Sequence, residues 1–416
     1  MARVVVDGHG RLREFSAVPY AGGDDLKQPV EPDAIFRAAG LDRTAFTETA
    51  PVSLPRTPAD QLRAWKGNHP ALPNTEMTVE IGTWKGRATF VKVRFPWDKP
   101  VEAGPAPTSL ATNLLRNGTF YGLVIGLFFA VLLAQRNWKL ERADRKGALR
   151  LAGVRFLLAF LAWVGTVHAL PENDMWALFY QGVGAWLLSA GLLWMLYLAL
   201  EPELRARWPH SIVTWNRLLA GRWKDAQVGA HILIGGTVGL LIWVSASLVE
   251  MGFGDRNSLG AEGGLDITLG AREWLAVHAA TLGGLLPVGL VLFLGVLGVK
   301  LLVRRDVPAA LLAAALAVPF NFQGQVAEHW QVIVPIFFAL FAILIFVLLR
   351  LGLVALCSAI FFLNSCGRIV VGADWTTWYA PYGLATLVLL LGIALFAFWC
   401  SLGSRELLGS SAAELG

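Results

Sequence analysis

The side chains with the widest chemical range in this sequence lie beside or within apolar stretches. Paired histidines could ligate a haem, provided that two of them face each other at matched depth in different helices. Intramembrane proteolysis would instead need neighbouring carboxylates with a histidine, a Ser–His pair or an HExxH zinc helix. The sequence has no HExxH, no GxSxG and no adjacent pair of glutamates. The candidate residues are His168, His231, His278, Glu250, Glu273, Glu328 and His329.

Most of these residues fall at the ends of apolar runs, where they can remain hydrated, and this favours a structural role for them. Phosphoryl transfer needs a Gly-rich loop, a strand lysine, an HRD loop and a DFG metal site, or a P-loop. None of these motifs occurs, and Gly252-Phe253-Gly254-Asp255 has the wrong order. The sequence therefore predicts no catalytic residue, no cofactor and no metal site.

The composition is typical of a membrane protein. Hydrophobic residues make up 55% of the chain and charged residues only 16%, whereas a soluble domain carries about 25% charge. The chain has 17 tryptophans, a residue that favours the membrane interface. Its net charge of +5 comes mainly from loops between apolar runs, which indicates membrane topology and not a nucleic-acid partner.

The first part of the chain, residues 1–105, has an ordinary polar composition and is expected to form a small α+β domain. Residues 106–117 are expected to be a linker, since the stretch 96–112 is rich in proline and small residues. Two hairpins are predicted around Gly8-His9-Gly10 and Lys85-Gly86. The predicted strands are Val4–Asp7, Leu12–Val18, Thr78–Trp84 and Ala88–Phe95, and the predicted short helices are Asp33–Ala39 and Ala59–Trp65.

The remainder, residues 118–403, is predicted to be an all-α bundle of membrane spans, followed by a cytoplasmic tail at 404–416. A span needs about 20 mostly apolar residues. Eight spans are expected, or nine if the short stretch 308–320 also crosses, with a turn at Arg350 and Gly352 between two of them. The eight are roughly 118–134, 151–170, 176–200, 228–250, 274–303, 331–349, 350–366 and 381–402.

Basic residues gather in the loops after the first, third and fifth spans. The excess of Lys and Arg on cytoplasmic loops then places residues 1–117 outside the cytoplasm. No signal peptide or earlier span precedes this domain in the sequence. We expect that the chain begins within a longer protein whose upstream span exports the domain. The alternative is that the domain stays inside and the charge rule fails.

The loop 201–226 is the most distinctive cytoplasmic segment, and it predicts an amphipathic helix at 204–225 lying in the membrane interface. Trp208, Ile212, Trp215, Leu219 and Trp223 recur at helical spacing, and the basic residues lie off that stripe. Such a helix could dock a partner or an anionic lipid headgroup, or it could merely connect two spans. The docking candidates are Trp208, Trp215, Arg217, Arg222, Trp223 and Lys224.

Several stretches of the chain resemble the C-terminal, non-catalytic half of large membrane-anchored bacterial serine/threonine protein kinases. They are VVVDGHGRLREFSAVP at 4–19, IFRAAGLDRTAF at 35–46, LRAWKGNHP at 62–70, VEIGTWKGRATFVKVRFPW at 79–97, RNWKLERADRKGALRLA at 136–152, YLALEPELRARWPHSIVTWNRLLAGRWKDAQVG at 197–229, LRLGLVALCSAIFFLN at 349–364 and DWTTWYAPYGLATL at 374–387. In that family a cytoplasmic kinase domain and one span precede an extracytoplasmic region and a bundle of spans, and this chain resembles the last two parts.

The resemblance implies an association with kinase signalling in the bacterial inner (cytoplasmic) membrane, and no kinase residue can be carried over to this chain. The leading hypothesis is a non-catalytic sensor or regulatory module whose partners are the lipid bilayer and a serine/threonine kinase domain, in cis or in trans. A transporter or channel-like bundle is the alternative. An intramembrane enzyme is a third hypothesis, and it requires Glu250, Glu273, His278, Glu328 or His329 to converge.

Overall fold

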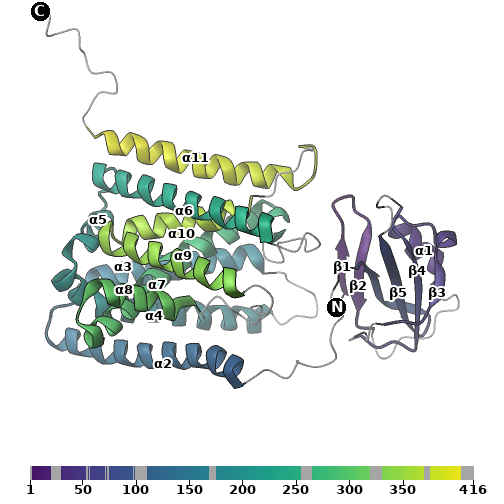
Figure 1. Ribbon diagram of the computed structural model, residues 1–416, viewed down its shortest axis with the longest axis horizontal. Helices are drawn as coiled ribbons and strands as arrows, with labels where there is room; N and C mark the ends of the chain where they lie inside the picture. The colour runs from purple at the N-terminus through teal and green to yellow at the C-terminus, as the bar shows by residue number, and fades with distance from the viewer. Residues whose placement is uncertain are drawn as a thin grey trace, which may run out of the picture. The chain divides into compact units, whose positions relative to one another are not determined.

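A computed structural model describes residues 2–19, 30–52, 55, 57–70, 72, 75–96, 98, 110–167, 175–253, 265–318, 330–369 and 375–403. The chain divides into two compact units, one ending at Pro107 and the other beginning at Thr108. Each unit is described by itself. The first is a small sheet domain and the second is a bundle of helices (Figure 1).

The N-terminal unit is a six-stranded antiparallel sheet with the strand order β1-β2-β6-β5-β4-β3. Both predicted hairpins are confirmed, and so is a short helix close to the predicted Asp33–Ala39. The elements are β1 (Ala2–Val6), β2 (Leu12–Ala17), α1 (Pro32–Ala38), a 3-10 turn (Arg43–Ala45), β3 (Thr47–Thr49), β4 (Gln61–Asn68), β5 (Glu76–Trp84) and β6 (Arg87–Arg94).

The predicted helix Ala59–Trp65 is wrong, because this segment enters strand β4 at Gln61. β4 pairs with β5 along its whole length, from Gln61 opposite Thr83 to Asn68 opposite Glu76. The segment is too short for its apolar residues to distinguish a helical period from a strand period. Cross-strand hydrogen bonding with β5, the next strand along the chain, decides the outcome.

One face of this sheet carries the core of the N-terminal unit. Trp65, Val79 and Val93 stand side by side on β4, β5 and β6, and all three are buried. Helix α1 covers this face with Ile35 and Phe36, and the Phe36 ring meets the Trp65 ring edge-on at 5.7 Å between centroids. Burial of these aromatic and branched side chains is the main force that holds α1 on the sheet.

The second unit consists of helices α2 to α11. Helix α2 begins at Leu110, so the predicted linker at 106–117 is already helical in its second half. The helices are α2 (Leu110–Lys139), α3 (Arg145–Thr166), α4 (Met175–Arg207), α5 (Pro209–Leu219), α6 (Ala226–Phe253), α7 (Ala271–Val303), α8 (Asp306–Ala317), α9 (Trp330–Arg350), α10 (Leu353–Cys366) and α11 (Ala380–Leu402), with a 3-10 turn at Leu265–Thr268 before α7.

Within the described residues, five helices are long and apolar enough to cross a membrane: α3, α4, α6, α7 and α11. This supports a multi-pass membrane protein, while the expected number of eight or nine spans is not confirmed. Helix α8 has 12 residues and measures about 18 Å, which is short of the roughly 30 Å hydrocarbon core.

The turn predicted at Arg350 and Gly352 is confirmed, since α9 ends at Arg350 and Gly352 adopts a positive φ of 97°. The predicted tail at 404–416 lies outside the described residues.

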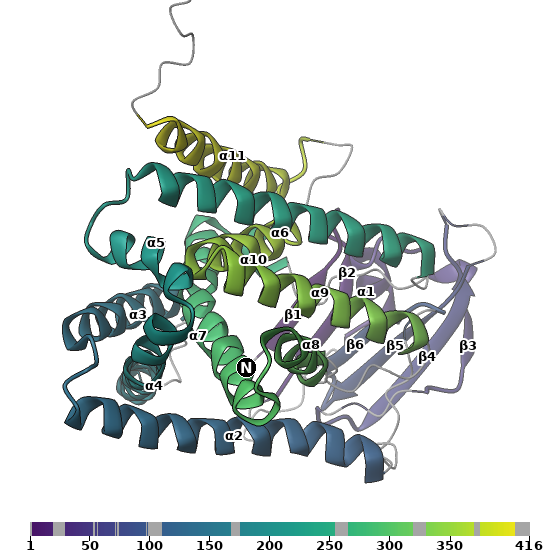
Figure 2. The same cartoon turned by 60° about the vertical axis from the view of Figure 1, so that its left-hand side comes forward.

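Helices α6 and α10 share the most extensive contact among the described parts of the bundle (Figure 2). Gly235 and Gly239, one turn apart on α6, lie directly against the backbone carbonyls of Ala355 and Ala359 on α10. Ser358 adds a hydrogen bond from its hydroxyl to the Ile232 carbonyl at 2.7 Å. Small residues let helix backbones approach in a membrane, where packing replaces the hydrophobic effect as the main attraction between helices.

A substitution of Gly235 by Ala tests this contact, because the contact decides whether the substitution stabilises or destabilises the bundle. In an open helical position Ala stabilises by about 1 kcal/mol relative to Gly, but the new Cβ at 235 would collide with the Ala355 carbonyl. We expect Gly235→Ala to destabilise the bundle by about 1–3 kcal/mol, seen as a lower midpoint of thermal unfolding in detergent. Gly284→Ala on α7 is the matched control, because nothing lies within 4 Å of its added Cβ, and it should leave the midpoint unchanged or raise it.

Candidate functional site

The segment from Trp208 to Asp225, called the elbow here, joins α4 to α6 and contains α5. The expected single helix at 204–225 is wrong, since residues 204–207 form the last turn of α4 and α5 spans only Pro209–Leu219. Pro209 has no backbone N–H and cannot continue the α4 ladder, but it suits the first turn of a new helix. The chain leaves α5 through Gly221, whose φ of +80° favours glycine.

The apolar side of the elbow is buried in the bundle. Trp208, Ile212 and Trp215 are only 6%, 3% and 8% exposed. The Trp208 ring lies 6.4 Å from the Phe293 ring of α7, and the Lys300 ammonium sits 4.3 Å above the Trp208 ring. The prediction that this stripe faces the membrane interface is therefore wrong, and the alternative of a helix connecting two spans describes the geometry. Helical spacing correctly grouped Trp208, Ile212 and Trp215 but did not show what covers them. Trp223, which belonged to the same predicted stripe, follows α5 and is 51% exposed.

The elbow contacts four other helices. The His210 Nε2 lies 2.6 Å from the Leu349 carbonyl at the end of α9, and the Thr214 hydroxyl lies 3.2 Å from His231 Nδ1 on α6. Arg150 of α3 donates to the Leu219 carbonyl at 3.3 Å. Gly352, before α10, lies directly on the Ser211 backbone. A displacement of any of these spans must therefore move or strain α5.

A buried polar group lies beneath the elbow. Tyr197 and Glu201, one turn apart on α4, are each 1% exposed. The Tyr197 hydroxyl and the Trp215 indole N–H are neighbours but do not reach hydrogen-bond geometry. The Glu201 carboxylate pairs with the more exposed Arg205. A buried carboxylate is costly unless it is paired, so this ion pair fixes the end of α4 at the elbow.

The basic side of the elbow has a different environment. Arg217 holds Asp225 with its Nη1 at 3.0 and 3.1 Å from the two carboxylate oxygens. Partial burial by itself raises the pKa of the Asp225 carboxyl. Hydrogen bonds from Arg217 and from nearby backbone N–H groups, together with the Arg217 charge, outweigh this effect, so the pKa of Asp225 lies below its ordinary value. Asp225 therefore stays ionised near neutral pH and neutralises Arg217.

Arg222, Trp223 and Lys224 are exposed. The Trp223 ring stacks on Phe396 of α11 at 5.6 Å, and the Lys224 ammonium lies 4.8 Å from the Trp223 ring and 5.8 Å from the Trp399 ring. These contacts hold both side chains on the end of α11. Of the six predicted docking residues, the structure thus leaves Arg222, Trp223 and Lys224 accessible, buries Trp208 and Trp215, and pairs Arg217 internally.

The titratable residues considered for haem or proteolytic chemistry do not converge where the structure describes them. His231 lies near the elbow, whereas His278 lies toward the other end of the bundle and donates from Nδ1 to the Trp274 carbonyl at 2.9 Å. These two histidines therefore cannot be paired axial ligands. Glu273 pairs with Arg272. His168, Glu328, His329 and the side chain of Glu250 lie outside the described residues. In the described part of the chain, no three His, Cys, Asp or Glu side chains are grouped to hold a metal.

Arg155 is an unusual residue that the sequence reading overlooked, together with Tyr197 and Glu201. It lies near the middle of α3, and its half-buried guanidinium rests against Gly283 of α7. The described residues place no carboxylate within ion-pair distance of it. An arginine inside an apolar run is itself a signal of function in a membrane protein, and this signal was present in the stretch 151–170.

The fold and the elbow define a multi-pass membrane protein with an N-terminal sheet domain. Comparison with protein-family models, curated proteins and solved structures found no match to the chain.

The burial difference within the elbow predicts different effects of two tryptophan substitutions. Trp215→Ala should destabilise the bundle by about 3–5 kcal/mol, as truncation of a buried aromatic does. Trp223→Ala should cost about 1 kcal/mol or less, because that ring is 51% exposed. Thermal unfolding in detergent measures both. Equal small losses would mean that Trp215 faces the lipid interface and not the core.

Proposed function

We propose that this chain is a non-catalytic sensor or regulatory membrane module that acts with bacterial serine/threonine kinase signalling. The observation that carries the proposal is the set of contacts between the elbow and α3, α6, α9 and α10. A signal that shifts the spans is transmitted to α5, and the exposed residues beside it present the change to a partner. The N-terminal domain receives the signal or reports on another protein.

Charge asymmetry of the bundle supports an orientation in the bacterial cytoplasmic membrane. The end that carries the elbow is strongly basic, and we propose that it faces the cytoplasm and that the N-terminal domain lies outside. Asn137 of α2 donates to Leu198 and Ala199 of α4, so the ends of these helices meet at the elbow end. The basic residues of this end are Arg136, Lys139, Arg142, Arg145, Lys146, Arg150, Arg205, Arg207, Arg217, Arg222, Lys224, Lys300, Arg304, Arg305 and Arg350.

The partner we propose is a kinase domain with an acidic surface, attached in cis or bound in trans. Arg222 and Lys224 are the cations through which it docks, because both are exposed beside α5. Charged residues at the rim of an interface steer association and fix orientation. No nucleic-acid partner is proposed, since the basic residues belong to a membrane-facing end and not to a separate basic domain.

The orientation predicts the labelling of two single cysteines. Thr49 on β3 and Lys146 near the start of α3 are both exposed. In intact cells a membrane-impermeant maleimide should label Thr49→Cys, and it should label Lys146→Cys only after permeabilisation. The unsubstituted chain, with Cys357, Cys366 and Cys400, measures the background. The reverse pattern would place the N-terminal domain inside and overturn the proposed orientation.

Charge reversal at the elbow tests the coupling to a kinase. Arg222→Glu combined with Lys224→Glu should abolish the regulated changes in serine and threonine phosphorylation, because an acidic partner would be repelled. The readout is quantitative phosphoproteomics of the native bacterium, alongside a strain in which residues 1–105 are deleted. Arg304→Glu with Arg305→Glu is the matched control, since it makes the same charge change at the same end of the bundle. Unchanged phosphorylation in both the elbow variant and the deletion strain would refute the proposal.

A transporter or channel-like bundle is the second candidate, and Arg155 is the observation that favours it. An unpaired cation near the middle of a span is costly and is typical of an ion or substrate path. If the elbow variant and the deletion strain leave phosphorylation unchanged, while Arg155→Gln alters the passage of an anion across vesicles containing the full chain, this second function replaces the first.

A further inference from the structure

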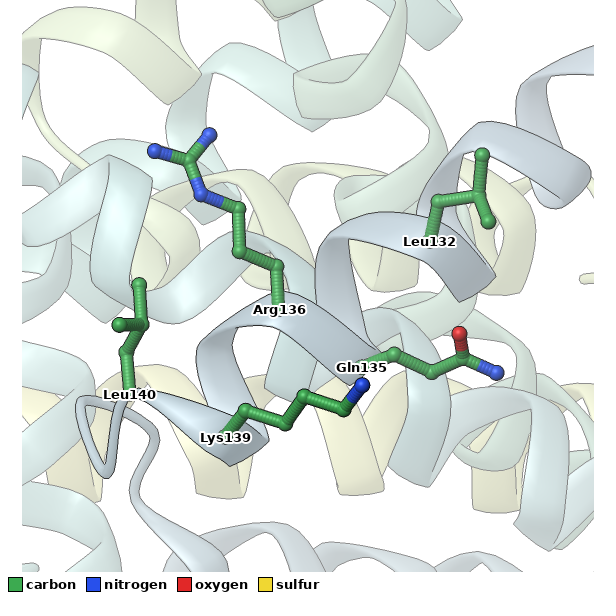
Figure 3. Close-up of a pocket in the computed structure, with 5 residues that line it drawn as sticks. All are labelled: Leu132, Gln135, Arg136, Lys139 and Leu140. Atoms are coloured by element: carbon green, nitrogen blue, oxygen red, sulfur yellow. The ribbon is translucent and has the colours of Figure 1, made fainter.

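One face of α2 forms an open groove near the elbow end of the bundle. Its residues recur at helical spacing over the last turns of α2 and at Leu140 just beyond them, and the open space above this face amounts to about 510 Å³. In Figure 3 the Arg136 and Leu140 side chains rise from the same edge of the helix, while Gln135 and Lys139 extend along the near side. The groove is lined by Leu132, Gln135, Arg136, Lys139 and Leu140.

The opposite face of α2 is fixed to the bundle, so the groove points away from it. Asn137 is 3% exposed, and its amide donates to the Leu198 and Ala199 carbonyls of α4 at 3.2 and 2.9 Å. Ala130 and Ala134 are buried on the same side. Rotation of α2 would break two buried hydrogen bonds, and the groove is thereby held outward, away from the other helices of the bundle.

The two cations of the groove have no protein anion. The described residues place no carboxylate within ion-pair distance of Arg136 or Lys139. Two other cations of this end are occupied: the Arg145 guanidinium lies 3.9 Å over the Trp138 ring, and Lys300 pairs with Asp306 at 2.5 Å. Glu141, the acidic residue nearest in sequence, is exposed and sits beyond the end of α2. The groove therefore keeps a double positive charge for an external anion.

The apolar members of the groove show what kind of anion fits. Leu132 and Leu140 are 45% and 48% exposed, and they flank the cations at the end of an apolar helix. A free inorganic anion gains nothing from exposed leucines, whereas a lipid presents an anionic headgroup and an acyl chain together. The long stems of Arg136 and Lys139 can reach the headgroup level from this depth.

We propose that this groove binds one anionic glycerophospholipid. Arg136 and Lys139 hold the phosphodiester, the Gln135 amide donates to a headgroup oxygen, and the acyl chain lies along Leu132. The proposal requires only that this end of α2 meets a membrane surface, in either orientation. It therefore stands or falls separately from the coupling to a kinase.

Native mass spectrometry of the full chain in detergent tests the proposal, with dioleoyl-phosphatidylglycerol and dioleoyl-phosphatidylcholine as probes. The unsubstituted protein should retain one phosphatidylglycerol at concentrations where phosphatidylcholine is lost. Arg136→Gln with Lys139→Gln should weaken this binding about tenfold or more, since each cation near the headgroups is worth about 1 kcal/mol. Arg304→Gln with Arg305→Gln removes the same charge from the same end and should leave the bound lipid in place.

Three outcomes would overturn the lipid site. They are equal retention of the two lipids by the unsubstituted protein, equal loss in both double variants, and displacement of phosphatidylglycerol by millimolar inorganic phosphate. The last would mean that the groove is a site for a free anion. The comparison of the two lipids needs only the unsubstituted protein, so it remains decisive even if the groove variant fails to fold.

Discussion

The packing of Ile212 and Trp215 between the ends of the spans is the contact on which the bundle depends. These side chains bury the apolar side of α5, and the polar groups around them bond to different helices. Arg150, His231 and the Leu349 carbonyl come from α3, α6 and α9, which are far apart in sequence. Polar groups within the hydrocarbon region must find partners inside the protein. The elbow supplies hydrogen-bond partners for such groups at the point where the helices end. It thereby sets the relative positions of spans that share no connecting loop.

Close backbone contact supplies the second constraint. In lipid there is little hydrophobic gain when two apolar helices meet, so association requires many short van der Waals contacts. Gly235 and Gly239 provide them by placing α6 directly on the Ala355 and Ala359 carbonyls. Helix α6 also begins at the elbow, where His231 meets Thr214. The rigid α6–α10 pair is thus connected to α5, and a shift of this pair would be passed to the exposed residues Arg222 and Lys224.

We propose that the cations at the basic end of the bundle bind partners as well as set the orientation in the membrane. Many cations there have an internal partner: Arg205 pairs with Glu201, Arg217 with Asp225 and Lys300 with Asp306. Among the cations that are left exposed, two pairs have different surroundings. Arg136 and Lys139 lie between exposed leucines on the outward face of α2, which suits an amphiphile. Arg222 and Lys224 lie beside the buried elbow helix, which suits an acidic protein surface. We therefore propose two different partners for the same kind of charge, according to the apolar groups around it.

The sequence by itself determined the membrane character of the chain, the two hairpins of the N-terminal domain and the turn at Gly352, because each follows from local hydropathy or turn chemistry. It also showed that Trp208, Ile212 and Trp215 share one helical face, since a spacing of three or four residues fixes that relation. Only the tertiary structure decided that this face is buried among the spans, that Ala59–Trp65 leads into a strand, and that Glu201 and Arg155 lie inside the bundle. Those outcomes depend on packing partners that the local spacing does not show, such as strand β5, Phe293 and Gly283. Spacing shows which side chains point together, but the helix or strand that covers them is set by the packing of the whole chain.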